Sequence, residues 1–194
     1  FDEIVTGFRV HIKGAQHYYG VTPDISCFGK AMANGMPISA IVGKKKIMKY
    51  FDKIFFSTTF GGETLSLVAA LETIKYLKKK KVINKIKQLS KNFHRDINKV
   101  IIELRLNKIF KIEGVWWRPA FGVCEGADKQ YLQILRKNLI KNKLLIGNNF
   151  NFCYEHTNIK VYREILKKTK MALIKTKEEK ILKKNHTTNI SVRS

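Results

Sequence analysis

Three short, mainly apolar runs alternate with glycine-containing connections in the first 43 residues, and this pattern restricts the possible folds strongly. The runs cover residues 1–5, 25–28 and 38–42. Short apolar runs bounded by turn residues are typical of buried strands, and buried strands separated by longer connections are typical of parallel or mixed sheets. We therefore expect an α/β protein in which a ligand binds at the strand ends.

Two polar residues lie at the ends of these predicted strands. Asp2 belongs to the first run, and Lys30 follows the second run 28 residues later (30 − 2 = 28). Because Gly29 and Ala31 flank Lys30, we expect burial, which disfavours a charged ammonium. A neutral lysine forms Schiff bases with carbonyl compounds such as pyridoxal phosphate, whose sites also present a carboxylate to the ring nitrogen. The alternative for Lys30 is a solvated surface position, since the chain has 38 lysines and arginines.

Four motifs extend this pattern along the chain. Their sequences are DEIVTGFR, GAQHYYGVTPD, FGKAMANGMPISAIVG and STTFGGETLS, in this order. In order and spacing they resemble the motifs of class III pyridoxal-phosphate aminotransferases, and they are most similar to those of the glutamate-1-semialdehyde 2,1-aminomutase group. The resemblance is dense as far as about residue 71 and thins beyond it. Four ordered motifs are far more specific than a single glycine pattern.

The resemblance implies a fold and a domain organisation. The fold would be that of a fold-type I PLP-dependent transferase of the α/β class. Residues 1–85 would be the second part of the PLP-binding large domain, and residues 86–176 a linker helix and a small C-terminal α/β domain. From their charged and weakly apolar composition, we expect residues 177–194 to be a disordered basic tail. The chain begins with Phe1, not methionine, so we expect it to be the C-terminal part of a longer protein with little activity by itself.

The resemblance also implies site residues, a cofactor and a partner. Lys30 would bind pyridoxal 5′-phosphate as a Schiff base and, once released, transfer a proton. Asp2 would keep the pyridine nitrogen protonated, and Ile4 would pack against a face of the ring. Thr59 would reach the cofactor phosphate of the partner subunit, which implies a homodimer. The substrate would be a small amino or keto compound, and no metal is expected.

Two of these residues keep a structural alternative. Ile4 can equally be a core residue. Thr59 precedes Gly61-Gly62 and a helix predicted from about Glu63, so its hydroxyl and the nearby N–H groups suit an anion, but a helix cap or turn position fits equally well.

The chain departs from the family pattern in two places that bear on substrate. It has Val5 where many class III transaminases have glutamine, and Gly62-Glu63-Thr64 where the aminomutase group has Gly-Asn-Pro. Neither change touches the implied cofactor residues. The sequence therefore leaves the choice between 2,1-aminomutase and transaminase open.

Charge introduces a different class of function. The net charge of +23 would attract nucleic acid or an anionic membrane surface, so a basic nucleic-acid-binding module is one alternative. Lysines cluster in residues 44–46, 78–81, 167–170 and 180–184 with few aromatic residues between them, which favours solvated helix faces. We expect no specific nucleic-acid partner.

A fragment of an ATPase is a second alternative, because residues 1–4 resemble the acidic end of a Walker B strand. The Gly-Lys pair has Asp24 at the first motif position and Ala31 where serine or threonine is required, so the chain contains no P-loop.

The cysteines and hydropathy indicate a compartment. The chain has 3 cysteines without the spacing of a zinc site or a disulfide framework, which predicts a reducing environment. No apolar run approaches the roughly 20 residues that span a bilayer. We expect a cytoplasmic protein without a membrane partner, with an organelle as the alternative.

The remaining elements follow from hydrophobic periodicity. We expect helices over residues 44–51, 63–79, 86–104, 128–142 and 159–174, two strands within 109–124, and an extended segment over 144–154.

Overall fold

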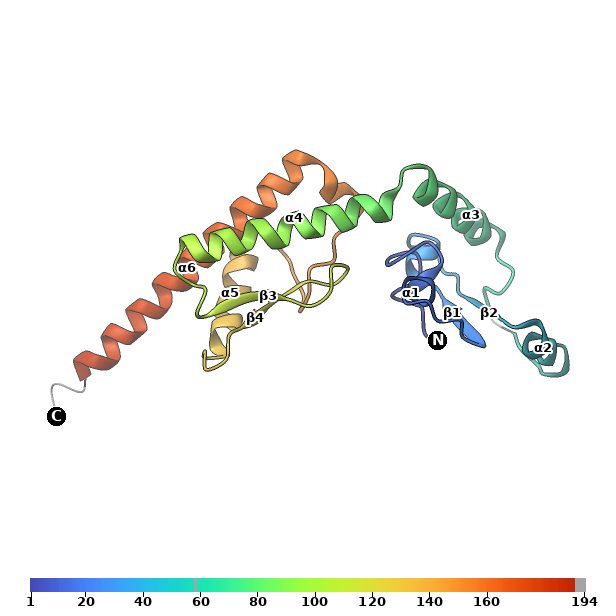
Figure 1. Ribbon diagram of the computed structural model, residues 1–194, viewed down its shortest axis with the longest axis horizontal. Coiled ribbons are helices and arrows are strands. Elements are labelled where there is room, and N and C mark those ends of the chain that lie inside the picture. The colour runs from blue at the N-terminus through green and yellow to red at the C-terminus, as the bar shows by residue number, and fades with distance from the viewer. Residues whose placement is uncertain (58, 191–194) are drawn as a thin grey trace. The chain divides into compact units, whose positions relative to one another are not determined.

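The computed structural model describes the backbone of residues 1–57 and 59–190, and the side chains as far as residue 179 (Figure 1). The chain divides into two compact units, Phe1–Lys85 and Ile86–Ser194. Each unit has its own cluster of buried apolar side chains.

The first unit is built on a two-stranded antiparallel sheet. Strand β1 (Ile25–Phe28) pairs with β2 (Ala40–Gly43), with Phe28 opposite Ala40. Asp2 adds an isolated parallel bridge to Cys27, so three chain segments run side by side. The strand that we predicted over residues 1–5 is reduced to this bridge, because the chain turns immediately afterwards and the Gly7 N–H donates to the Glu3 carbonyl at 2.8 Å.

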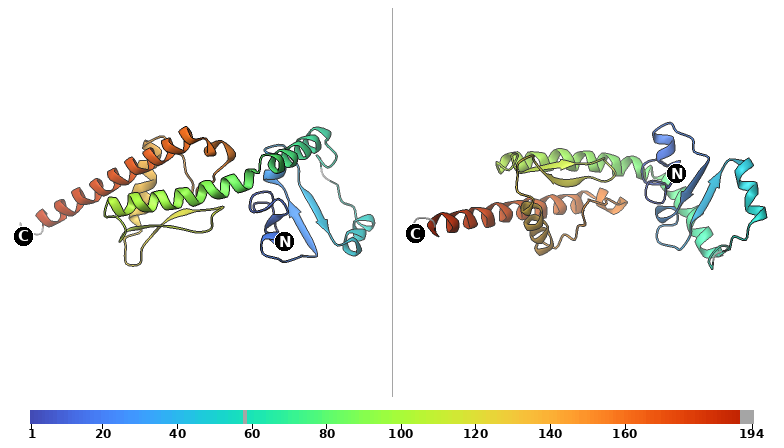
Figure 2. Two further views of the ribbon diagram at one scale, coloured as in Figure 1. Left: turned by 45° about the horizontal axis from the view of Figure 1, so that its top comes forward. Right: turned by 90° about the horizontal axis from the view of Figure 1, so that it is seen from below.

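Short helices connect these segments. They are α1 (Gly14–Tyr18), the 3₁₀ turn η1 (Lys30–Met32), α2 (Lys45–Met48), η2 (Lys49–Lys53) and the longer α3 (Thr64–Lys79). The main buried cluster of this unit is small and consists of Phe28, Met32, Ala33 and Ala70. Figure 2 shows α3 and the β1–β2 pair from two further directions.

The second unit is dominated by long helices. Helix α4 (Val82–Glu103) starts at the end of the first unit and presents a buried stripe at every fourth residue, namely Leu89, Phe93, Ile97 and Ile101. This spacing is that of one helix face. Strands β3 (Phe110–Glu113) and β4 (Ala120–Val123) form an antiparallel pair, followed by α5 (Gln130–Lys141), the 3₁₀ turn η3 (Tyr154–Thr157) and α6 (Ile159–Ile190).

Two segments of the second unit differ from the sequence expectation. The extended segment over 144–154 forms no strand in the structure. Helix α6 continues through Ile190, into the region where we expected a disordered tail. Residues 191–194 of that tail lie outside the described residues.

Candidate active site

A buried carboxylate organises the start of the chain. Glu3 is 1% exposed and accepts hydrogen bonds from the Thr6 hydroxyl and from the N–H groups of Ala15 at 2.9 Å and Gln16 at 2.7 Å. Buried carboxylates require such partners. Glu3 thereby ties the segment next to Asp2 to the start of α1. We did not predict this role; the signal was a second acidic residue within a mainly apolar run.

The Glu3 carboxylate also restricts position 14 to glycine. Its φ of +82° lies in the left-handed region, and an added Cβ would lie 2.6 Å from Glu3 Oε1. Only glycine meets both conditions without strain. The glycine of the GAQ motif is therefore explained by the close approach of the Glu3 carboxylate.

Asp2 is fixed beside β1 by backbone hydrogen bonds. The Cys27 N–H donates to the Phe1 carbonyl at 2.9 Å, and the Glu3 N–H donates to the Cys27 carbonyl at 2.8 Å. The Asp2 side chain is exposed, and its Oδ1 accepts from the Ile4 N–H at 2.9 Å. Among the described residues, its Oδ2 accepts no hydrogen bond, so one carboxylate oxygen is available at the end of β1.

Lys30 lies two residues beyond β1 in a strained conformation. Its φ is +44°, a left-handed value that costs a residue other than glycine about 1–2 kcal/mol. Such outliers gather at functional sites. The burial that we expected for Lys30 is wrong: the residue is exposed, while Met32 and Ala33 of the same turn are the buried ones. In this tight turn the two apolar residues face the core, which leaves Lys30 on the solvent side.

Ile4 lies against the residue that precedes this lysine. A Cβ added to Gly29 would lie 3.2 Å from Ile4 Cδ1, so the side chain of Ile4 covers the residue directly before Lys30. Ile4 is half-buried, which is compatible with a core role and with contact to a ligand. Asp2, Ile4 and Lys30 thus gather at the C-terminal end of β1.

Thr59 is not joined to this group by any hydrogen bond among the described residues. It is exposed, in a turn before α3. Glu63 caps α3 by accepting from the N–H groups of Leu65 at 2.8 Å and Ser66 at 2.7 Å. Hydrogen bonds from Ser66 and then from Leu65 hold the pKa of Glu63 below its usual value.

This capping bears on the two alternatives for Thr59. The Glu63 carboxylate accepts from the N–H groups of Leu65 and Ser66, so these two groups of α3 are not available to an anion. It also removes the alternative that Thr59 is the helix cap, because Glu63 has that position.

Comparison with known proteins identifies the family. Residues 1–116 match the family model described as aminotransferase class-III. The chain belongs to the class III aminotransferases. The 3-aminobutyryl-CoA aminotransferase of Cloacimonas acidaminovorans is 35% identical over 188 residues, which cover 89% of this chain and 44% of the relative. The glutamate-1-semialdehyde 2,1-aminomutase of Methanococcus vannielii is 32% identical over 184 residues, covering 89% of this chain and 43% of the relative.

Solved structures of transaminases and of a PLP-bound protein share the fold. The Sphingopyxis sp. MTA144 FumI protein, in its PLP internal aldimine form, matches with a TM-score of 0.83 at 22% identity, covering 92% of this chain and 43% of that one. The ornithine aminotransferase of Toxoplasma gondii matches with a TM-score of 0.78 at 24% identity over 92% of this chain and 43% of that one. The chain therefore has part of the fold-type I transferase fold, and it spans less than half the length of these relatives.

The cofactor of the class III aminotransferases is pyridoxal 5′-phosphate, and the residues at the end of β1 fit it. The carboxylate of Asp2 has an oxygen available for a protonated ring nitrogen. Lys30 is exposed, and the Ile4 side chain lies against Gly29, the residue before it. An acid, an amine and an aliphatic side chain at one strand end are the donor set that such a ring requires.

Within the described part of the chain, no group of three or more histidine, cysteine or acidic side chains is placed to hold a metal ion. Nor does any described helix have the length and hydropathy needed to cross a membrane.

Proposed function

We propose that this class III aminotransferase transfers amino groups through Lys30, which binds pyridoxal 5′-phosphate as a Schiff base. The observation that carries the proposal is the bridge between Asp2 and Cys27. This bridge fixes the Asp2 carboxylate beside β1. Lys30 follows the last residue of β1 by two positions and has a strained backbone. The family supports the chemistry, and the geometry supports these particular residues.

Each residue would have a separate task. The bound cofactor supplies an electron sink for the bond that is broken at the substrate carbon. The Asp2 carboxylate would accept a hydrogen bond from the ring N–H and keep the proton there. Ile4 would pack against one face of the ring. Lys30 Nζ would hold the cofactor covalently and, when released, take the proton from the substrate carbon that bears the amino group.

We propose small amino and keto compounds as the substrate class. Relatives of this chain carry the names 3-aminobutyryl-CoA aminotransferase and glutamate-1-semialdehyde 2,1-aminomutase. The motifs at the start of the chain favour the aminomutase group, and we propose a reaction of that kind. Val5 and Glu63 are the departures that distinguish this chain from the family patterns.

A homodimer with Thr59 at its interface completes the proposal. The segment around Thr59 exposes large apolar side chains, with Phe55 97%, Phe56 57% and Phe60 57% exposed. Contiguous exposed apolar residues of this kind favour burial against another protein surface. The Thr59 hydroxyl would then reach the cofactor phosphate of the partner subunit.

The cysteines bear on the compartment. The three cysteines are free thiols, which supports the cytoplasm as the compartment of this protein.

Reductive trapping tests the lysine assignment. Pyridoxal phosphate is added to the purified protein, borohydride reduces the adduct, and peptide mapping locates it. We expect the adduct on Lys30 and its loss in Lys30→Arg. Lys46→Arg, which changes an exposed lysine of α2, is the matched control and should keep the adduct on Lys30. An adduct distributed over surface lysines and unchanged in Lys30→Arg would exclude the proposal.

A further inference from the structure

A groove of about 240 Å³ lies within the first unit, and none of its lining residues belongs to the group at the end of β1. It is formed by the segment before α1 and by the junction of α3 with α4. Its lining residues are His11, Ile12, Leu77, Lys78, Lys81, Ile83 and Asn84. No acidic side chain lines it, in contrast to the mixed charge of an ordinary protein surface.

Hydrogen-bond donors of this groove have no partner of opposite charge. Among the described residues, neither Lys78 nor Lys81 forms an ion pair. His11 Nδ1 accepts from the Lys13 N–H at 3.1 Å, so in the neutral imidazole the proton is on Nε2 and can be donated. Burial, and then the charges of His17 and Lys13, lower the pKa of His11. Neutral His11 thus remains a donor beside two ammonium groups.

The backbone of Lys81 gives an independent observation. Lys81 adopts φ +50° where α3 ends, and its N–H donates to the Lys78 carbonyl at 3.2 Å. This left-handed position after a helix is one that glycine or asparagine adopts most easily. A lysine here carries a backbone cost and places an ammonium group at the groove.

The floor of the groove is apolar. Ile12, Leu77 and Ile83 are half-buried and contribute aliphatic surface next to the donors. Binding sites for small molecules commonly combine such a surface with a few polar groups that orient the ligand. Ammonium groups and an imidazole N–H form strong, charge-assisted hydrogen bonds with oxyanions.

We propose that this groove binds a small molecule that carries a phosphate or carboxylate group next to a short apolar part. Lys78, Lys81 and His11 bind the oxyanion, and the aliphatic floor covers the apolar part. The proposal does not depend on the chemistry at Lys30. The competing role for Lys78 and Lys81 is to stabilise the C-terminus of α3, where positive charge is favourable.

The test separates binding from stability. Phenyl phosphate, inorganic phosphate and hexanoate are titrated into the full chain at constant ionic strength, and binding is followed by calorimetry. We expect phenyl phosphate and hexanoate to bind more tightly than inorganic phosphate, because only they fill the apolar floor. Lys78→Gln and Lys81→Gly should each weaken binding by about threefold to fivefold, the range for an exposed charge contact.

Lys81→Gly is the decisive variant, because it removes the charge and also relieves the backbone. We expect weaker binding together with an unchanged or higher thermal midpoint. The matched control, Lys46→Gln with Lys49→Gln, removes two exposed lysines outside the groove and should leave binding unchanged. Equal weakening in the control, or unchanged binding in Lys81→Gly, would overturn the proposal.

Discussion

At the scale of single residues, Glu3 and Gly14 determine the geometry around the candidate site. We expect Gly14→Ala to destabilise the protein by about 2–3 kcal/mol more than Gly20→Ala. Both glycines have positive φ, +82° and +69°, but only the Cβ at position 14 meets the Glu3 carboxylate, at 2.6 Å. Nothing lies within 4 Å of a Cβ at position 20, so Gly20→Ala measures the backbone cost alone. Urea unfolding gives both values; equal destabilisation would show that the contact with Glu3 is unimportant.

The sequence singles out residues with a local signal, and it does not show which residues act across the chain. Asp2 and Lys30 stand out because each is polar at the end of an apolar run, and their roles stay predictions. Glu3 was missed because its partners, Ala15 and Gln16, lie 12 and 13 residues away in sequence. The exposure of Lys30 depends on which residues of a 3₁₀ turn face the core, and its apolar neighbours alone do not decide this.

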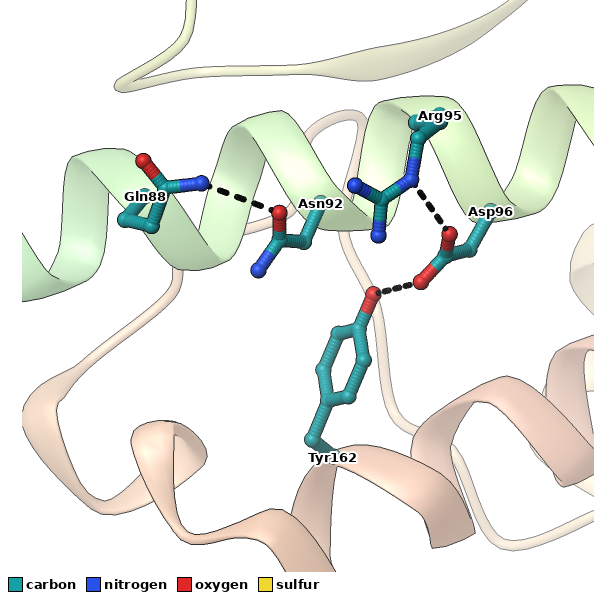
Figure 3. Close-up of polar contacts among 5 residues, drawn as sticks. All are labelled: Gln88, Asn92, Arg95, Asp96 and Tyr162. Atoms are coloured by element: carbon teal, nitrogen blue, oxygen red, sulfur yellow. Dashed lines mark hydrogen bonds and ion pairs between the residues drawn. The ribbon is translucent and has the colours of Figure 1, made fainter.

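At the scale of elements, α4 and α6 are connected by one polar cluster (Figure 3). The Tyr162 hydroxyl of α6 donates to Asp96 Oδ2 of α4 at 2.7 Å, and Arg95 Nε donates to Asp96 Oδ1 at 2.9 Å. In the same view, Gln88 Nε2 donates to Asn92 Oδ1 at 3.0 Å within α4. Burial raises the pKa of Tyr162, so the phenol stays protonated and remains a donor. Asp96 is therefore one acceptor that connects the two helices, and Glu103 of α4 is another, accepting from Lys170 Nζ of α6 at 2.6 Å.

This cluster predicts a pH dependence of stability. The hydrogen bond from Arg95, with a further one from Tyr162, lowers the pKa of Asp96 in the folded protein below its unfolded value of about 3.9. The contribution of Asp96 is then present above about pH 4 and is lost as the pH falls through the folded pKa. We expect the free energy of unfolding of Asp96→Asn to fall less steeply than that of the wild type between about pH 5 and pH 2.

The measurement is urea unfolding at several pH values, with Gln88→Ala as the control. This variant changes a contact within one helix and should keep the pH dependence of the wild type. If Asp96→Asn and the wild type lost stability in parallel, the pKa of Asp96 would not be coupled to folding.

Elements were predictable where one period extended over the whole segment. The stripe of α4 repeats every four residues, and β1 has the bounds that its apolar run indicated. The prediction of a strand over residues 1–5 was wrong. The Glu3 side chain binds the start of α1, and the extended segment ends after the bridge at Asp2. Tertiary contacts determine where this extended segment ends, and the local sequence does not reveal those contacts.

At the scale of the whole molecule, the two units differ in how much core each has. The second unit buries fourteen apolar residues in one cluster, whereas the main cluster of the first unit has four. The first unit also exposes large apolar side chains, including Phe55, Leu67 and Leu71. Because buried apolar area is the main source of stability, the first unit should open more readily than the second.

Hydrogen exchange measures this difference unit by unit. We expect amides of β1 and α3 to exchange faster than those of α4 and α5, since local opening free energies follow the buried contacts of each region. Phe93→Ala, at a fully buried position of α4, should cost about 3–5 kcal/mol and accelerate exchange in the second unit. Pyridoxal phosphate should slow exchange in residues 1–5 and 25–33, because a ligand stabilises the state that binds it. Equal protection of both units would contradict the difference in opening, and cofactor protection confined to the second unit would contradict the placement of the cofactor at the end of β1.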